Sequence, residues 1–279
     1  MHIFLIRHGE SVDNVAGLYA GSRDSALTAH GVLQTRRLGL HLARSGVHVK
    51  HIFSSNLQRA VKTAEAVLDA QNPKAKGNAV ELVQLTELRE KDFGSGEGVR
   101  FGVGKSGDRK PHEGAETPEA MRVRADRFLD DHLFPALRSS DHAEDAACVV
   151  VAHGLILGTL FRAVCARLLP GHLTLGPEVP KAGSDYRSEL PVLPSWSNTG
   201  YLHGIFSPST HVKSDSSPAG RDMLDLRLLV KEVNRTDHLK GLKKTRGGIG
   251  SARFDDKQKS IDSFFGSQAK KRKADEATP

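Results

Sequence analysis

Two short apolar runs in this sequence end in the same way, and this shared ending limits the folds that the chain can adopt. Residues 3–6 lead into His8, residues 149–151 lead into His153, and each histidine is followed by a glycine. Short continuous apolar runs are typical of strands that are covered on both faces, as in parallel α/β sheets. Ligands bind such sheets beyond the carboxyl ends of the strands. We therefore expect both histidines to face one crevice.

The spacing of the other apolar residues predicts strands and helices in alternation. The predicted strands are Ile3–Ile6, His51–Ser54, Val80–Leu85, Cys148–Ala152, Tyr201–Phe206 and Leu224–Val230, and the predicted helices are Thr28–Ser45, Asn56–Ala70, Thr117–Leu137 and Leu155–Leu169. This alternation predicts a three-layer α/β fold, in which helices flank an open, mostly parallel sheet. Residues 93–116 and 170–194 are rich in Gly, Pro and charged residues, and we expect them to form loops over one end of the sheet.

Charge is distributed unevenly along the chain. The net charge is +7, and residues 231–279 hold 13 Lys and Arg against 7 Asp and Glu. The body is therefore nearly neutral, and it gives no sign of a nucleic-acid-binding face. Hydrophobic periodicity ends after Asn234. We expect one folded domain over residues 1–234 and a disordered basic tail over residues 235–279.

Several protein classes are excluded by composition. The one stretch long enough to span a bilayer, residues 146–169, carries His153 and two arginines, and the apolar run at the N-terminus is too short for a secretory signal. Cys148 and Cys165 both lie in apolar runs, which argues against a disulfide framework or a zinc knuckle. We expect an intracellular protein that does not span a membrane.

Arginines accompany both histidines at the predicted sheet edge. Arg7 directly precedes His8, and Arg59 lies in the first turn of the helix that follows the strand over residues 51–54. Guanidinium groups bind phosphate oxygens through paired hydrogen bonds, so this set suits a phosphoryl group better than a neutral ligand. The alternative is that each histidine only satisfies a buried polar network.

Four separated segments, in the right order, resemble the signature of the histidine phosphatase superfamily in its phosphoglycerate-mutase-like branch. They are residues 7–11 with Asn14, residues 24–28 with Gly31 and Gln34, residues 54–60 and residues 152–154. The resemblance covers roughly residues 1–205 and implies a central mixed sheet flanked by helices.

The resemblance also implies a role for each candidate residue. His8 is expected to be the nucleophile that becomes a phosphohistidine. Arg7, Arg59 and His153 are expected to neutralise the phosphoryl oxygens, and Asn14 to hydrogen-bond the same group. No metal and no cofactor is implied. Trp196 precedes a late strand at a place where the family often lines the substrate pocket.

A general acid is also required, and the family places a glutamate shortly before a glycine. Glu90 fits this position because Gly94 follows it, and Glu87 is the alternative. Glu87 would otherwise be an exposed carboxylate that pairs with Arg89 or Lys91.

The chain departs from the family after Gly94, where members commonly continue into Trp-Glu-Gly and residues 94–98 read Gly-Ser-Gly-Glu-Gly. The missing tryptophan leaves the wall of the substrate pocket undefined. The short insert favours a phosphatase over a phosphoglycerate-mutase-type phosphotransferase, which stays the alternative. The substrate is expected to be a phosphorylated small molecule or a phosphoprotein. Basic loop residues are candidates for recognising a polyanionic substrate, or are ordinary solvated side chains: Lys91, Arg100, Lys105, Arg109, Lys110, Lys181 and Arg187.

A non-catalytic interpretation also exists, because the superfamily includes members that use the fold only for binding. A member that has lost activity is expected to lack at least one of the four residues Arg7, His8, Arg59 and His153. All four are present, which favours an enzyme.

The tail carries a second resemblance. Gln258, Ile261, Phe264 and Phe265 have the spacing of the motif by which many replication and repair proteins bind the sliding clamp PCNA. The resemblance implies a clamp-binding protein. The basic run over residues 270–273 is typical of a nuclear import signal or of a solvated charge run. We therefore expect the nucleus, the cytoplasm or both as the location.

Overall fold

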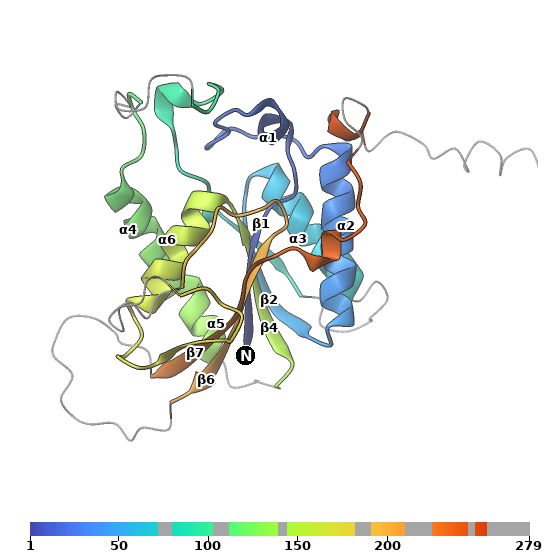
Figure 1. Cartoon of the computed structure of the whole chain (residues 1–279). Coiled ribbons are helices and arrows are strands. Elements are labelled where there is room, and N and C mark those ends of the chain that lie inside the picture. Colours follow the sequence, from blue (N-terminus) through green and yellow to red (C-terminus); the bar gives the residue numbers. More distant parts are fainter. Residues whose placement is uncertain are drawn as a thin grey trace, which may run out of the picture.

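The computed structural model describes residues 1–71, 80–102, 112–138, 144–181, 191–209, 225–244 and 249–255. In this part of the chain, seven strands form one sheet in the order β3-β2-β4-β1-β6-β7-β5. Helices α2 and α3 cover one face of the sheet, and α4, α5 and α6 cover the other (Figure 1). The predicted three-layer α/β fold is confirmed.

The strands are β1 (His2–Arg7), β2 (His48–Ser55), β3 (Leu82–Leu85), β4 (Ala146–Ala152), β5 (Leu173–Leu175), β6 (Tyr201–Pro208) and β7 (Leu226–Arg235). The helices are α1 (Val12–Ala16), α2 (Ala29–Arg44), α3 (Gln58–Gln71), α4 (Pro118–Phe128), α5 (Phe134–Arg138) and α6 (Gly154–Cys165), with a π-helical turn over Leu129–Leu133 between α4 and α5.

Most neighbouring strands are parallel. The pairs β1–β4, β2–β4, β2–β3 and β5–β7 are parallel, whereas β6 runs antiparallel to both β1 and β7. Two short elements were not predicted. Helix α1 is five residues long and depends on a capping box between Ser11 and Asn14, and β5 is three residues long in a stretch that was expected to be a loop. Elements this short leave no periodic signal in the sequence.

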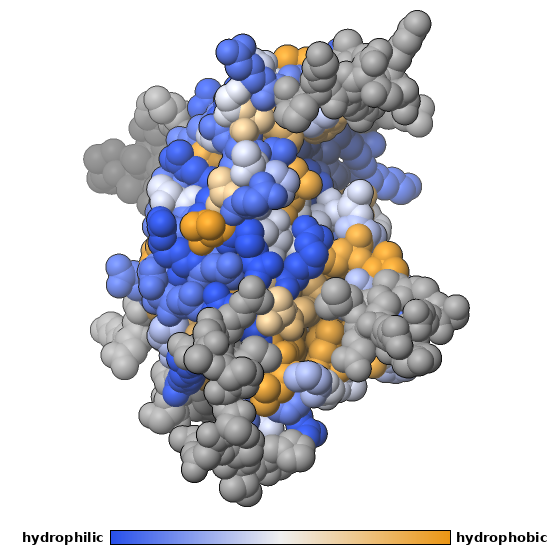
Figure 2. Space-filling view, turned by 90° about the vertical axis from the view of Figure 1, so that its left-hand side faces the viewer, coloured by the Kyte–Doolittle hydropathy of each residue, from blue (hydrophilic) through white to orange (hydrophobic). Residues whose placement is uncertain are grey.

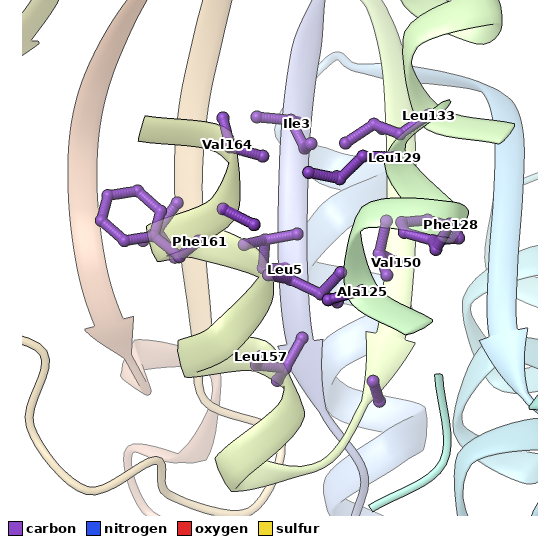
Figure 3. Close-up of a cluster of buried hydrophobic side chains, with 14 of the residues drawn as sticks. Ile3, Leu5, Ala125, Phe128, Leu129, Leu133, Val150, Leu157, Phe161 and Val164 are labelled. Atoms are coloured by element: carbon purple, nitrogen blue, oxygen red, sulfur yellow. The ribbon is translucent and has the colours of Figure 1, made fainter. Parts of the chain in front are cut away.

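The middle of strand β1, residues 3–6, is a continuous apolar run because it contributes to two cores. Ile3 and Leu5 pack into the cluster between the sheet and helices α4 and α6, and Figure 3 shows Ile3 next to Val164 of α6. Phe4 and Ile6 point to the opposite face and join the cluster beneath α2 and α3. Because successive residues of a strand face opposite sides, a strand buried on both faces needs a continuous apolar run.

The register of the two central strands positions the candidate residues. Arg7 at the end of β1 lies opposite Ala152 at the end of β4. His8 and His153 are the next residues of each strand, so the two rings come together, with 4.9 Å between their centroids. In Figure 1 this edge is the upper end of the sheet, beneath α1.

The face of the molecule on the side of α4 and α6 is largely polar where it is described. Figure 2 views the molecule from the side of α4 and α6, where hydrophilic residues form most of the surface and hydrophobic residues gather in a few separate areas. Among the described helices, none has the length and apolar character needed to cross a bilayer.

The chain stays packed on the domain beyond the boundary expected at residue 234. His238 is buried and its Nε2 lies 2.9 Å from the hydroxyl of Thr199. Lys244 pairs with Glu10, and the backbone N–H of Ala29 donates to the carbonyl of Ala252. The red segment in Figure 1 follows this path beside α2. The expected boundary is too early, because polar contacts of this kind carry no hydrophobic periodicity. Residues 256–279, with most of the predicted tail, lie outside the described residues.

We expect removal of this segment to destabilise the domain. A chain that ends at residue 234 loses the hydrogen bond between His238 and the buried Thr199 hydroxyl, which keeps only its bond to the carbonyl of Asn198. It also loses the ion pair between Lys244 and Glu10 and the backbone hydrogen bond from Ala29 to Ala252. One hydrogen bond contributes about 0.5–1.5 kcal/mol, so we expect these losses together to lower the free energy of unfolding by at least about 2 kcal/mol. Urea denaturation of the 1–234 and 1–255 chains measures the difference. Equal unfolding midpoints for the two chains would contradict this packing role.

Candidate active site

A cavity of about 490 Å³ opens at the carboxyl edge of the central strands. Its wall includes all six candidate residues of the catalytic cluster: Arg7, His8, Asn14, Arg59, Glu90 and His153. They come from β1, α1, α3, the segment after β3 and the end of β4. The fold therefore gathers in one place residues that are widely separated in the sequence.

The imidazole of His8 has a defined tautomer. Its Nδ1 lies 2.7 Å from the carbonyl oxygen of Gly9, and a carbonyl only accepts, so Nδ1 carries the proton. The other ring nitrogen, Nε2, then holds a lone pair. Gly9 is required for close packing, because a Cβ there would lie 2.7 Å from the side chain of Thr35 and 2.9 Å from the carbonyl oxygen of Gly31.

The surroundings of His8 keep its ring neutral. Burial disfavours the imidazolium form, and the positive charges of Arg59 and Arg7 disfavour it further, so the pKa of His8 lies well below its ordinary value. A neutral imidazole with a free Nε2 lone pair is the form that can act as a nucleophile.

We expect the His8 ring to stay uncharged as the pH falls through 6.5, the value around which an unperturbed histidine titrates. Protonation would place a third positive charge beside two arginines in a buried site. Histidine ¹H–¹³C NMR titration, with the His8 signal assigned from the His8→Asn variant, measures the midpoint. A midpoint at or above 6.5 would show that the site does not depress this pKa.

His153 offers a hydrogen-bond donor to the cavity, whereas His8 offers an acceptor. Arg59 donates from Nε to Nδ1 of His153 at 3.2 Å, and because a guanidinium only donates, the proton of the neutral His153 ring lies on Nε2. This Nε2 is buried and has no hydrogen-bond partner among the described residues. Burial and the charge of Arg59 also lower the pKa of His153 well below its usual range. The site thus places an imidazole donor beside the imidazole acceptor of His8.

Both arginines are held in place by backbone carbonyls. Arg59 is 1% exposed, and its two terminal nitrogens donate to the carbonyls of Arg23 at 2.6 Å and Gly21 at 2.7 Å. Burial lowers the pKa of Arg59 to about 10, which leaves it charged at neutral pH. Arg7 donates to the carbonyl of Trp196, while its Nε is buried without a partner in the described structure. An anion in the cavity would give acceptors to buried donors that have none.

Asn14 is oriented by Asn198, which lies two residues after Trp196 in the segment expected near the substrate pocket. The side-chain oxygen of Asn14 accepts from the Ser11 amide at 3.2 Å and from Nδ2 of Asn198 at 2.9 Å. Since its oxygen is occupied, Asn14 has its amide N–H groups available. Asn198 also donates to the carbonyl of His8 at 3.2 Å, so it links Asn14 to the backbone just beyond β1. Asn198 follows Trp196 closely, which was the available signal.

The carboxylate of Glu90 lies at the N-terminus of α6. It accepts hydrogen bonds from the backbone amides of Leu155 at 3.1 Å, Ile156 at 3.3 Å and Lys91 at 2.9 Å. These donors fix the carboxylate at the edge of the cavity, close to Gly154, where an added Cβ would lie 3.8 Å from Oε2 of Glu90. Orphan amides at a helix N-terminus are natural partners for a carboxylate.

The alternative acid lies elsewhere. Glu87 is absent from the cavity wall, and its carboxylate lies 4.0 Å from Arg127 and 3.1 Å from the hydroxyl of Thr86. Its partner is therefore Arg127, rather than the expected Arg89 or Lys91. Of the two glutamates, only Glu90 shares the cavity with His8.

Aromatic residues supply the wall that the missing tryptophan left undefined. Tyr19 packs against Phe93, with ring centroids 4.6 Å apart, and edge-on against Phe101 at 4.5 Å. All three line the cavity, and Trp196 lines it as expected. The signal for Tyr19 and Phe101 was weak, because neither belongs to a motif.

The three basic loop residues that the structure describes do not line the cavity. Lys91, Arg100 and Lys181 are absent from its wall, and the other four candidates, Lys105, Arg109, Lys110 and Arg187, lie outside the described residues. A different arginine, Arg162 of α6, lines the cavity and was not predicted as a site residue. Within the described part of the chain, no group of three or more His, Cys, Asp or Glu side chains is arranged to hold a metal ion.

Sequence comparison identifies relatives that share most of this domain. The profile of the histidine phosphatase superfamily (branch 1) matches residues 3–176. A probable phosphatase of Schizosaccharomyces pombe is 30% identical over 269 residues, which cover 93% of this chain and 78% of that protein. A 2,3-bisphosphoglycerate-dependent phosphoglycerate mutase of Rhizobium etli is 32% identical over 170 residues, which cover 57% of this chain and 77% of the mutase.

Solved structures show the same fold. A mycobacterial glucosyl-3-phosphoglycerate phosphatase superposes with a TM-score of 0.60 at 19% identity, covering 84% of this chain and 98% of that one. A phosphoglycerate mutase from Bacillus anthracis superposes with a TM-score of 0.56 at 21% identity, covering 86% of this chain and 95% of that one. With the profile match over residues 3–176, the chain belongs to the histidine phosphatase superfamily, branch 1.

Proposed function

We propose that this protein is a phosphatase that hydrolyses a phosphomonoester through a phosphohistidine on His8. The observation that carries the proposal is the pairing of opposite functions in one cavity. His8 offers a lone pair on Nε2, while buried N–H groups of Arg7 and His153 have no partner within the described structure. A phosphoryl group needs both, a nucleophile in line with phosphorus and donors for its equatorial oxygens.

In the first step, Nε2 of His8 attacks phosphorus as the P–O bond to the leaving group breaks. Glu90, in its protonated form, transfers its proton to the leaving oxygen, and the alcohol departs. Charge on the three phosphoryl oxygens is balanced by Arg7, Arg59 and the N–H of His153, while the amide of Asn14 donates to the same group. The Nδ1–H of His8 stays on the carbonyl of Gly9 throughout.

In the second step, the Glu90 carboxylate removes a proton from water as the oxygen attacks phosphorus. The P–N bond breaks, its electron pair returns to Nε2 of His8, and inorganic phosphate leaves. Both side chains are then in their starting states. The charge is balanced by fixed side chains, so this mechanism requires no metal ion.

Hydrolysis is favoured over phosphate transfer because a relative named as a phosphatase aligns with more of this chain than a relative named as a mutase. The probable phosphatase of S. pombe aligns with 93% of this chain, whereas the mutase of R. etli aligns with 57%. A mutase-type phosphotransferase is the alternative, and it predicts conversion of 3-phosphoglycerate to 2-phosphoglycerate in the presence of 2,3-bisphosphoglycerate.

The direct test is hydrolysis of p-nitrophenyl phosphate by the purified full-length chain in EDTA. We expect turnover that the chelator does not reduce. Absence of turnover from acidic to neutral pH would favour the non-catalytic alternative, in which the fold serves only to bind a partner. Loss of turnover in EDTA with recovery on adding a divalent cation would refute the metal-independent mechanism.

We also propose that the tail tethers the enzyme to the sliding clamp PCNA in the nucleus. The support is the spacing of Gln258, Ile261, Phe264 and Phe265, which lie outside the described residues, together with the basic run at 270–273. Calorimetry of the full-length chain with PCNA should detect binding that the Phe264→Ala/Phe265→Ala double variant loses, with phosphatase turnover preserved. Equal affinity of the wild-type and double-variant chains for PCNA would show that Phe264 and Phe265 do not bind the clamp.

A further inference from the structure

The cavity continues from the catalytic cluster along one face of α6. Leu155, Gly158 and Arg162 all line it, and their spacing of three and four residues places them on the same side of the helix. His153 directly precedes this helix. One helix face therefore connects the catalytic end of the cavity to an arginine further along.

The guanidinium of Arg162 lies over Gly158. A Cβ added to Gly158 would lie 3.6 Å from both terminal nitrogens of Arg162. This fits the direction of long helical side chains, which lean toward the N-terminus of their helix. Gly158 follows His153 by five residues, so the guanidinium lies about 7–8 Å from His153 along the helix axis.

Arg162 has no acidic partner in the described structure. No described carboxylate lies within salt-bridge distance of it, and its side chain is exposed. Arg167, just beyond the end of α6, differs in that it bridges both Asp126 and Asp130. On the cavity wall, Arg162 is thus a positive charge that no described side chain neutralises.

Apolar and aromatic side chains form other parts of the cavity wall. Tyr19, Phe93, Phe101, Leu193 and Trp196 all line the cavity with Arg162. A wall of this kind suits an apolar or aromatic body, which gains by leaving water.

We propose that Arg162 binds a second anionic group of the substrate. The preferred substrates are then phosphomonoesters with an apolar or aromatic body that ends in an oxyanion such as a carboxylate. This inference rests on the proposed phosphatase function, because it concerns the part of the substrate that is not transferred.

The test compares three aryl phosphates that differ only at the para position. They are phenyl phosphate, 4-carboxyphenyl phosphate and its uncharged carboxamide analogue. We expect kcat/KM for the carboxylate to exceed that for the carboxamide, and the ratio of the two to fall about fivefold in Arg162→Gln, as for one partly exposed ion pair. The change should lie mainly in KM, since the distal group binds equally before and during the reaction.

Three further variants sharpen the comparison. Arg162→Lys keeps the positive charge and should keep most of the ratio, whereas Arg162→Glu should invert it. Arg44→Gln removes the same charge from an exposed position outside the cavity and should leave the wild-type ratio unchanged.

Different results would overturn the proposed phosphatase function and the proposed role of Arg162. If the wild-type chain hydrolyses none of the three compounds, the proposed phosphatase function fails. If it hydrolyses all three and the carboxylate-to-carboxamide ratio is the same in wild type, Arg162→Gln and Arg162→Glu, then Arg162 binds no second anion and only the further inference is overturned.

Discussion

Replacement of His8 by asparagine is expected to lower kcat for aryl phosphate hydrolysis by at least about ten-thousand-fold. The imidazole Nε2 is the atom that forms the P–N bond, and asparagine has no comparable nucleophile. The side-chain amide of asparagine can still donate to the carbonyl of Gly9, as Nδ1 of His8 does at 2.7 Å. The variant therefore removes the nucleophile while keeping the hydrogen bond that holds the turn.

The remaining cavity should still bind anions in this variant. Arg7, Arg59 and His153 supply the positive charge and the donors, so inorganic phosphate should inhibit or bind with a dissociation constant within about tenfold of the wild-type value. Steady-state kinetics and phosphate titration calorimetry measure the two quantities. If His8→Asn kept more than about a tenth of wild-type kcat, His8 would not be the nucleophile.

The second large effect is expected for Glu90→Gln. General acid–base catalysis contributes about 10²–10⁴-fold, so kcat should fall by that factor while phosphate affinity changes little. The amide oxygen of glutamine can still accept from the amides of Leu155 or Ile156 at the start of α6, so the loop stays in place. The loss should be greater for an alkyl phosphate than for p-nitrophenyl phosphate, because a poor leaving group depends more on protonation.

Glu87→Gln is the matched control for this prediction. Glu87 is three residues from Glu90, but its carboxylate lies beside Arg127 and outside the cavity wall. We expect Glu87→Gln to retain wild-type turnover on both substrates. A larger loss of turnover in Glu87→Gln than in Glu90→Gln would show that Glu87, and not Glu90, transfers the proton.

The sequence was sufficient to predict every strand of the described sheet except β5, together with the cluster around His8. The continuous apolar runs of β1 and β4 determine that both strands are buried, and parallel register then brings His8 and His153 together. Arg59 lies at the same edge of the sheet because it is in the first turn of α3, which begins just after β2 ends. In each case the relevant signal is local and repeats along the element.

The outer part of the site could not be predicted in the same way. Tyr19, Phe101 and Arg162 line the cavity because of tertiary packing, and none of them lies in a recognisable motif. In the sequence, Arg162 looks like any polar residue of an amphipathic helix. Only the structure shows that its guanidinium lies over Gly158. Likewise, His238 contacts the Thr199 hydroxyl and the rings of His41 and Tyr201, and Lys244 pairs with Glu10. These contacts lie beyond residue 234, where hydrophobic periodicity ends and gives no sign of them.

The most direct test of the account is to trap the phosphoenzyme and locate the phosphoryl group. The full-length chain would be mixed with a ³²P-labelled phosphomonoester, quenched in alkali, digested and mapped by mass spectrometry under conditions that preserve phosphohistidine. We expect an acid-labile label on the peptide that contains His8, with increased accumulation in Glu90→Gln when the leaving group is p-nitrophenol. A label on His153, or turnover with no labelled enzyme in either chain, would contradict it.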